Sequence, residues 1–240
     1  MLVEVCANSL ESALNAERGG ADRIELCSEL AVGGITPSYG LLKAVKEQVS
    51  IPVHVLIRPR SGDFTYSDLE FDIMKENIKL CKELGFQGIV SGILKNDYTL
   101  DDERTKSLID ASTNMNFTFH RAFDWVKAPL ETLSRLELLG AHCVLSSGQR
   151  KTAMEGFDFL KELKESAKNI LVMPGSGIND GNVKLFKEEG FRAVHLSGTK
   201  FHKSLRIAPP ISMNSVSFLN DDKIGTSHLE TIIAVVNKVK

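Results

Sequence analysis

The stretch Arg23-Ile24-Glu25-Leu26-Cys27 decides the fold of this chain. Its apolar residues alternate with a charged or thiol-bearing residue, which is the two-residue period of a β-strand with two unlike faces. Ile24 and Leu26 share one face, and Arg23, Glu25 and Cys27 share the other. The same Glu-x-Cys spacing occurs at residues 4–6, inside another strand-like segment. If the two segments are neighbouring strands, two carboxylates and two thiols converge on one surface.

A recurring glycine pattern separates helices from strands along the rest of the chain. In four places a charged or leucine-rich helical segment ends in Gly, and a β-branched segment follows within a few residues. Gly commonly ends a helix because it adopts the left-handed conformation without strain. The four junctions are 20–24, 85–89, 140–144 and 190–194. Helix, glycine and strand in regular alternation indicate βα units.

Eight segments have the pattern of strands, and their starts are spaced by roughly 20 to 35 residues, which suits a strand plus a crossover helix. The predicted strands are 2–6, 23–27, 53–58, 88–93, 116–121, 142–146, 169–173 and 192–197. Helical patterns lie between them; at 67–84, Ser67 and Glu70 predict a capping box. We therefore predict an α/β protein, a single-domain (β/α)8 barrel over residues 1–240. An open doubly wound sheet is the alternative.

Residues 200–223 do not fit the alternation of strands and helices. The segment is polar, contains Pro209-Pro210 and has no clear period. We predict a long loop after strand eight, either a lid or partly disordered.

The parity of the strands predicts which side chains line the barrel. One face of each strand packs on helices and the other fills the interior. The apolar residues are expected to face the helices, so the side chains at the alternate strand positions line the interior. These interior-facing residues are Glu4, Cys6, Glu25, Cys27, His54, Arg58, Thr118, His120, His142, Ser146, His195 and Ser197. Active sites of such barrels lie at the C-terminal ends of the strands.

Composition and charge exclude several classes of protein. The chain is 42% hydrophobic and 25% charged, which is ordinary for a soluble globular protein. A formal net charge of -2, without a basic run, argues against binding nucleic acid or an anionic membrane. Residues 1–5 enter a strand pattern directly, without the features of a signal peptide. We predict a soluble, cytoplasmic protein with neither nucleic acid nor membrane as a partner.

Four predicted interior residues have the chemistry of a catalytic pocket: Glu25, Arg58, His120 and His195. A buried charge needs a partner, so we expect Glu25 to pair with Arg58 or Arg23. A His beside a carboxylate can act as a general base. The alternative is an ion-pair network that only fills the barrel.

Loops at the strand ends predict an anion site. Arg58 and Arg60 could clamp a carboxylate or phosphate, unless both lie in a solvated loop and pair with Asp63 and Asp68. Gly-rich loops follow strands seven and eight, where barrels frequently bind phosphate. Ordinary turn chemistry is the alternative for these loops. The candidate anion-binding residues are Arg60, Gly175, Ser176, Gly177, Ser197 and Gly198.

The four cysteines, with no CxxC pair, are neither a disulfide framework nor a structural zinc site. Cys6 and Cys27 could approach each other, because neighbouring strands lie about 4.8 Å apart. Two thiolates favour a soft metal such as Cu(I). A disulfide, or simple packing of small buried side chains, is the alternative. Cys81 lies in a helical pattern and Cys143 has helix-facing parity, so both are expected only to pack.

A set of motifs together resembles the CutC family, known as copper homeostasis proteins. The motifs are EVC (4–6), GADRIELC (20–27), GGITPS (33–38), IRPRSGDF (57–64), TFHRAFD (118–124), LSSG (145–148), MPGSGI (173–178) and HLSG (195–198). The resemblance implies a TIM barrel, a cytoplasmic location and a homo-oligomer, a dimer or a tetramer. It also implies copper binding, with Cys6 and Cys27 as the candidate ligands.

Two functions remain open at this point. The first is a Cu(I)-binding protein of copper homeostasis. The second is an enzyme of unknown reaction that acts on a small anionic or phosphorylated metabolite. An interaction scaffold is a third reading, but it explains the polar interior poorly. Whether the chain is an enzyme stays undecided.

Overall fold

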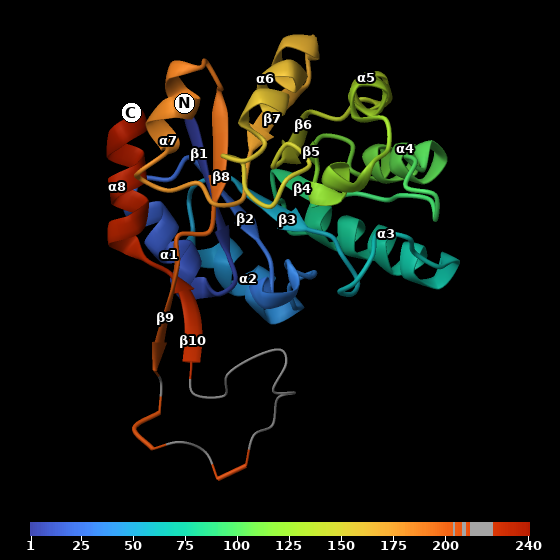
Figure 1. The fold of residues 1–240 in the computed structure, drawn as a ribbon. Helices are drawn as coiled ribbons and strands as arrows, with labels where there is room; N and C mark the ends of the chain where they lie inside the picture. Colours follow the sequence, from blue (N-terminus) through green and yellow to red (C-terminus); the bar gives the residue numbers. More distant parts are fainter. Residues whose placement is uncertain (204, 208–209, 212–222) are drawn as a thin grey trace.

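Eight parallel strands close into a barrel in the computed structural model (Figure 1). The structure describes residues 1–203, 205–207, 210–211 and 223–240. The strands are β1 (Leu2–Ala7), β2 (Arg23–Leu26), β3 (Val53–Leu56), β4 (Gly88–Ser91), β5 (Asn116–Phe119), β6 (Cys143–Ser146), β7 (Leu171–Pro174) and β8 (Ala193–Leu196). The hydrogen-bonded order is β7-β6-β5-β4-β3-β2-β1-β8. The predicted barrel is confirmed, and the doubly wound alternative is wrong.

The helices cover the outside of the barrel (Figure 1). They are α1 (Leu10–Arg18), α2 (Tyr39–Gln48), α3 (Asp68–Glu83), α4 (Asp102–Ala111), α5 (Pro129–Leu139), α6 (Phe157–Ser166), α7 (Val183–Glu188) and α8 (Leu229–Val239). The C-terminal helix α8 packs against both α7 and α1, which completes the outer ring. The predicted capping box of Ser67 and Glu70 is confirmed at the start of α3. Among the helices of the described residues, none is both long and apolar enough to cross a membrane.

The main hydrophobic core lies between the strands and the helices. It contains the apolar residues that were predicted to face the helices, among them Val5, Ile24, Val55, Phe117 and Val194. Two small apolar clusters are separate from this core. One holds Cys6, Cys27, Leu56 and Val90, and the other holds Cys143, Leu145, Met173 and Ala193. Their residues have inward parity, so the barrel interior combines small apolar layers with buried charged side chains.

The prediction for the sixth strand was wrong. His142 and Ser146 were expected inside the barrel and Cys143 outside, but Cys143 packs in an interior cluster with Met173. His142 Nδ1 accepts a hydrogen bond from the backbone N–H of Phe117 at 3.1 Å. Ser146 Oγ is bonded to a loop carboxylate described below. Residues 143–145 are all apolar because this strand is buried on both faces, so no alternation identifies the inward parity.

The segment after β8 begins and ends in strands that had been predicted as loop. β9 (Thr199–Lys203) and β10 (Lys223–Ser227) form an antiparallel pair that projects from the barrel (Figure 1). Ser227 anchors β10, because its Oγ donates to the Cys6 carbonyl at 3.1 Å and its N–H donates to Ser12 Oγ at 3.0 Å. The loop prediction for 200–203 and 223 was therefore wrong. The rest of the predicted loop includes residues 204, 208–209 and 212–222, which lie outside the described residues.

Candidate functional site

A cavity of about 610 Å³ opens at the C-terminal ends of the barrel strands. Its lining includes all four residues predicted for a catalytic pocket, together with one of the two predicted copper ligands. These residues are Cys6, Glu25, Arg58, His120 and His195. They come from β1, β2 and β8 and from the positions just beyond β3 and β5. The structure therefore brings together side chains that are up to 189 residues apart in the numbering (195 minus 6).

Glu4 is the centre of a charged network below the cavity. Its side chain is fully buried; Oε2 accepts from Arg23 Nε at 2.5 Å, and Oε1 lies 2.8 Å from His195 Nδ1. Burial alone would raise the pKa of Glu4, but the charge of Arg23 and the hydrogen bond with His195 outweigh it and lower the pKa to about 2. The expected pair between Glu25 and Arg23 is wrong, because Arg23 forms its ion pair with Glu4.

His195 is oriented by this network. Because ionised Glu4 is an acceptor, His195 Nδ1 carries the proton in this hydrogen bond, which leaves Nε2 for another partner. Burial lowers the pKa of His195, but the carboxylates of Glu25 and Glu4 more than offset this effect, so the pKa is raised. A carboxylate that fixes the ring in this way is a common partner of a metal-binding His.

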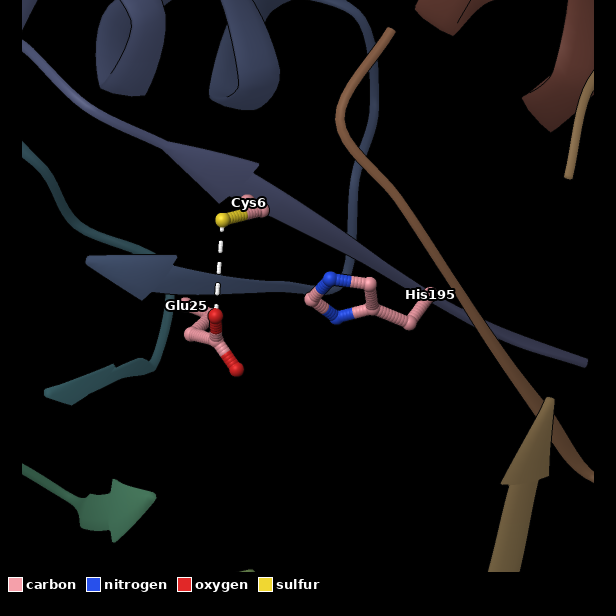
Figure 2. A group of neighbouring side chains, drawn as sticks. All are labelled: Cys6, Glu25 and His195. Carbon is pink, nitrogen blue, oxygen red and sulfur yellow. Dashed lines mark hydrogen bonds between the residues drawn. The ribbon is translucent and has the colours of Figure 1, made fainter. Parts of the chain in front are cut away.

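The thiols of Cys6 and Cys27 meet at the floor of the cavity. Their Sγ atoms lie 3.5 Å apart. Cys6 also donates to Glu25 Oε1 at 3.4 Å, and this hydrogen bond is drawn in Figure 2. The hydrogen bond with Cys27, burial and the neighbouring Glu25 all raise the pKa of Cys6 well above its usual value. Cys6 is therefore a protonated thiol at neutral pH, and all four cysteines are free.

Glu25 has one oxygen without a protein partner. Oε1 accepts from Cys6, whereas the buried Oε2 has no hydrogen-bond partner in the described structure. Burial raises the pKa of Glu25. One ligand atom each of Cys6, Glu25 and His195 lies within 4.8 Å of the others, and the side chains point toward one another (Figure 2). A thiol, a carboxylate and an imidazole at this spacing fit a metal ion.

Arg58 does not pair with Glu25, contrary to the prediction. Its Nη1 donates to the carbonyls of Val32 and Gly34 at 2.8 Å each, and its Nη2 donates to the carbonyl of Gly62 at 2.8 Å. Its Cζ lies 5.1 Å from the ring centroid of Phe64, in a cation–π contact. Arg58 therefore holds two loops together while it lines the cavity.

His120 lies one residue beyond β5, where it caps the short helix η2 (Arg121–Trp125). Its Nδ1 accepts from the backbone N–H of Ala122 at 3.1 Å. Its Nε2 is buried without a hydrogen-bond partner in the part of the chain that the structure describes. Burial and the positive charge of Arg58 lower the pKa of His120 to about 3. The prediction of a His beside a carboxylate thus fits His195, whereas the neighbouring charge of His120 is a guanidinium.

The predicted anion-binding residues are only partly brought together. Ser176, Gly177, Ser197 and Gly198 line the cavity. Gly175 lies behind the lining, where an added Cβ would be 2.5 Å from Leu145.

Arg60 points into the solvated loop, as in the alternative reading of the sequence. It pairs with Glu70 Oε1 at 2.6 Å and Asp63 Oδ1 at 3.0 Å. The second partner expected in that alternative, Asp68, instead pairs with Arg104.

The sequence analysis missed Arg121 and Asp124, which follow His120. Arg121 lines the cavity, and its Nε donates to Asp124 Oδ2 at 2.8 Å. Asp124 also accepts from Ser146 Oγ at 2.6 Å and from Ser147 N–H at 3.0 Å, so it ties the loop after β5 to the loop after β6. The available signal was an Arg and an Asp immediately after a predicted strand end, where barrel sites lie.

The comparisons with known proteins agree with this fold. The model of the CutC family matches residues 1–200. The human protein named copper homeostasis protein cutC homolog is 51% identical over 207 residues, which cover 85% of this chain and 73% of the human protein. A CutC family protein of Pasteurella multocida is 42% identical over 245 residues, with 100% of this chain and 99% of that protein covered.

A solved structure shows the same likeness in three dimensions. The crystal structure of a Streptococcus agalactiae protein described as a copper homeostasis protein CutC superimposes with a TM-score of 0.78 at 34% identity. The match covers 82% of this chain and 98% of the other chain. The family match spans β1 to β8, including every residue of the cavity floor described above. The chain belongs to the CutC family.

Proposed function

We propose that this chain binds Cu(I) through Cys6 and Cys27, with His195 as a third ligand. The observation that carries the proposal is the 3.5 Å distance between the two Sγ atoms, beside an imidazole already oriented by Glu4. Thiolates are soft ligands that favour Cu(I), and imidazole also suits copper. The names of the relatives, which refer to copper homeostasis, support the same function.

The location of the thiols suits a bound copper ion that is shielded from solvent. Cys6 is 4% exposed and Cys27 is fully buried, yet Cys6, Glu25 and His195 line the cavity and are reachable through it. A Cu(I) ion there would replace the proton of Cys6, and its positive charge would act on the unpartnered oxygen of Glu25.

An anaerobic titration with Cu(I) against a competing chelator tests the proposal. We expect about one tightly bound ion per chain, lost in the Cys6→Ser, Cys27→Ser double variant. Cys81→Ser is the matched control, because Cys81 is an equally buried thiol that packs in α3, away from the cavity. Unchanged binding by the double variant would refute the proposal. Tighter binding of Zn²⁺ than of Cu(I) would assign the site to a different metal.

The size of the cavity favours a second function, namely binding and conversion of a small anionic metabolite. A volume of about 610 Å³ is typical of a small-molecule site and far exceeds that of a metal ion. Ser176 and Gly177 have left-handed φ values of +77° and +75°, and backbone N–H groups in turns of this kind can bind anions. Together with Ser197, Gly198 and Lys200, they line one wall of the cavity.

Calorimetric titration with inorganic phosphate tests this second function. We expect binding to the wild type and weaker binding to Gly177→Ala, whose methyl group would strain the left-handed backbone beside Thr152. Gly140→Ala is the control, since Gly140 has a φ of +97° at the end of α5 and is absent from the cavity lining. Equal phosphate binding by all three proteins would contradict an anion site at these loops.

A further inference from the structure

The hydrogen bonds of His120 identify which of its nitrogens carries the proton. Nδ1 accepts from the N–H of Ala122 at 3.1 Å, so it uses its lone pair and carries no hydrogen. A neutral imidazole has one hydrogen, which must then be on Nε2. His120 is 6% exposed, it lines the cavity, and its Nε2 has no acceptor among the described residues. His120 therefore carries a buried N–H donor without an acceptor, on a side chain that lines the cavity.

Arg58 supplies a positive charge beside this donor. The two side chains lie against the same ring, since the Phe64 centroid is 4.9 Å from the His120 centroid and 5.1 Å from Arg58 Cζ. The guanidinium of Arg58 donates to neutral carbonyls, and within the described residues no carboxylate lies at ion-pair distance from it. Arg58 is 5% exposed, and burying an uncompensated guanidinium is costly.

The rest of the cavity floor shows that this positive region is local. Glu4, Cys6 and Glu25 belong to the neighbouring strands β1 and β2, and Cys27 directly follows β2. His120 and Arg58 follow β5 and β3. Arg121, the next residue after His120, also lines the cavity, but its charge is compensated by the ion pair with Asp124, so the uncompensated positive charge is that of Arg58. The cavity thus has an acidic, thiol-bearing floor and a cationic side with a hydrogen-bond donor.

We infer that His120 and Arg58 form a carboxylate subsite, in which the Nε2–H group of His120 donates to an oxygen of a small carboxylate ligand and Arg58 neutralises the charge of that ligand. This inference rests on the second proposed function and names the chemistry of its ligand. It assigns His120 the role of a donor, whereas the sequence suggested a general base. A neutral imidazole that donates in this way can polarise a carboxylate or carbonyl oxygen.

NMR of the protein labelled with 15N-histidine tests the inference, with acetate as the probe. We expect the His120 signals of the tautomer protonated at Nε2 and a shift of the Nε2–H signal when acetate is added. A His120 ring protonated at Nδ1, or an Nε2–H signal that acetate leaves unchanged, would overturn the inference. Inorganic phosphate forms the second arm, and tighter binding of phosphate than of acetate at His120 would overturn the assignment to carboxylates.

Two substitutions separate the donor from the structural role of His120. In His120→Asn the side-chain oxygen can still accept from Ala122, but the donor is withdrawn, so acetate should bind roughly ten- to a hundredfold more weakly. His120→Gln places an amide N–H near the position of Nε2 and should restore part of the affinity. Equal acetate binding by His120→Asn and the wild type would refute the subsite. Cu(I) binding is measured on the same proteins and should be unchanged by His120→Asn. A wild type that binds acetate at His120 but no Cu(I) would contradict the copper proposal alone and leave the carboxylate subsite standing.

Discussion

Glu4 Oε1 lies 2.8 Å from His195 Nδ1, and the opposite oxygen of the same carboxylate receives Arg23. The carboxylate therefore directs the His195 ring and increases its basicity, while Arg23 keeps Glu4 ionised. Residues that orient a ligand in this way commonly change metal affinity when they are altered.

Glu4→Gln is expected to weaken Cu(I) binding by about 10- to 100-fold, because His195 loses the anionic acceptor that orients it. Chelator competition measures the change. Glu11→Gln is the control, since Glu11 is an exposed acid in the first turn of α1. An unchanged Cu(I) affinity in Glu4→Gln would show that His195 is not a ligand.

Cu(I) binding is expected to release protons and to strengthen as the pH rises. The pKa of Cys6 is raised well above its usual value, so this thiol is protonated at neutral pH and must lose its proton when it binds a metal. The apparent affinity should increase up to about tenfold per pH unit for each proton released. Calorimetry in two buffers of different ionisation enthalpy counts the protons. Binding that does not depend on pH would contradict thiolate ligation by Cys6.

The free energy of unfolding is expected to fall as the pH decreases from 6.5 toward 4. Burial, together with Arg23 for His54 and Arg58 for His120, lowers the pKa of His54 to about 4 and that of His120 to about 3. Below pH 6.5 the unfolded chain binds protons at these two residues that the folded chain does not. Each His therefore lowers the free energy of unfolding by about 2 to 3 kcal/mol at pH 4.5. The pKa of His195 is raised, so the folded chain binds this proton more tightly than the unfolded chain does. His195 therefore increases the free energy of unfolding as the pH falls.

Urea denaturation at pH 7 and pH 4.5 measures this loss. The His54→Asn, His120→Asn double variant should lose less stability than the wild type over that interval, while His202→Asn on exposed β9 should behave as the wild type does. Glu4 causes a second decrease in the free energy of unfolding at lower pH. The stabilisation by its ionised carboxylate is lost as the pH falls from about 4.5 toward the lowered pKa of about 2. An unfolding free energy that is constant between pH 7 and 4.5 would contradict the buried, neutral state of both His residues.

Gly92→Ala is expected to displace His120 and to weaken acetate binding. A Cβ at position 92 would lie 2.7 Å from His120 Nδ1 and 3.2 Å from Phe119, so the His120 ring must move, at a cost of about 1–3 kcal/mol. Gly40→Ala is the matched control, because an added Cβ there meets no atom within 4 Å and α2 gains a better helix former. Thermal denaturation and the NMR titration with acetate distinguish the two variants. Full acetate affinity in Gly92→Ala would contradict a precise position for the His120 ring.

Asp124→Asn is expected to lower the free energy of unfolding by about 2–4 kcal/mol, since several donors lose a charged acceptor. Those donors are Arg121 Nε, Ser146 Oγ, and the N–H and Oγ of Ser147. In a chain of this size each kcal/mol lowers the melting temperature by about 2–4 °C. Asp72→Asn removes an exposed pair with Lys75 and should change stability by less than about 1 kcal/mol. Equal melting temperatures of the two variants would contradict the bridging role of Asp124.

Much of the site follows from the alternation in the first two strands. Glu4, Cys6, Glu25 and Cys27 could be assigned to the interior because apolar residues occupy every second position around them. The sixth strand could not be assigned, since Cys143, Val144 and Leu145 carry no alternation. The partners of Arg58 were also beyond prediction, because they are carbonyls, and a carbonyl is present in every residue. The β9–β10 pair was missed because its segments are short and polar and are separated by a long insertion.

The closure of the barrel gives the cavity two unlike margins. The hydrogen-bonded order begins at β7 and ends at β8, and these two strands close the barrel by contact, without an assigned strand pairing in the described residues. Cys6, Glu25 and His195 lie on one side of this contact, on the consecutive strands β1, β2 and β8. The loops of Gly177 and Gly198 follow β7 and β8, one from each side. A metal ion would therefore bind residues on one side only, whereas an anion held by both loops would bridge the two strands and slow deuterium exchange on both of them.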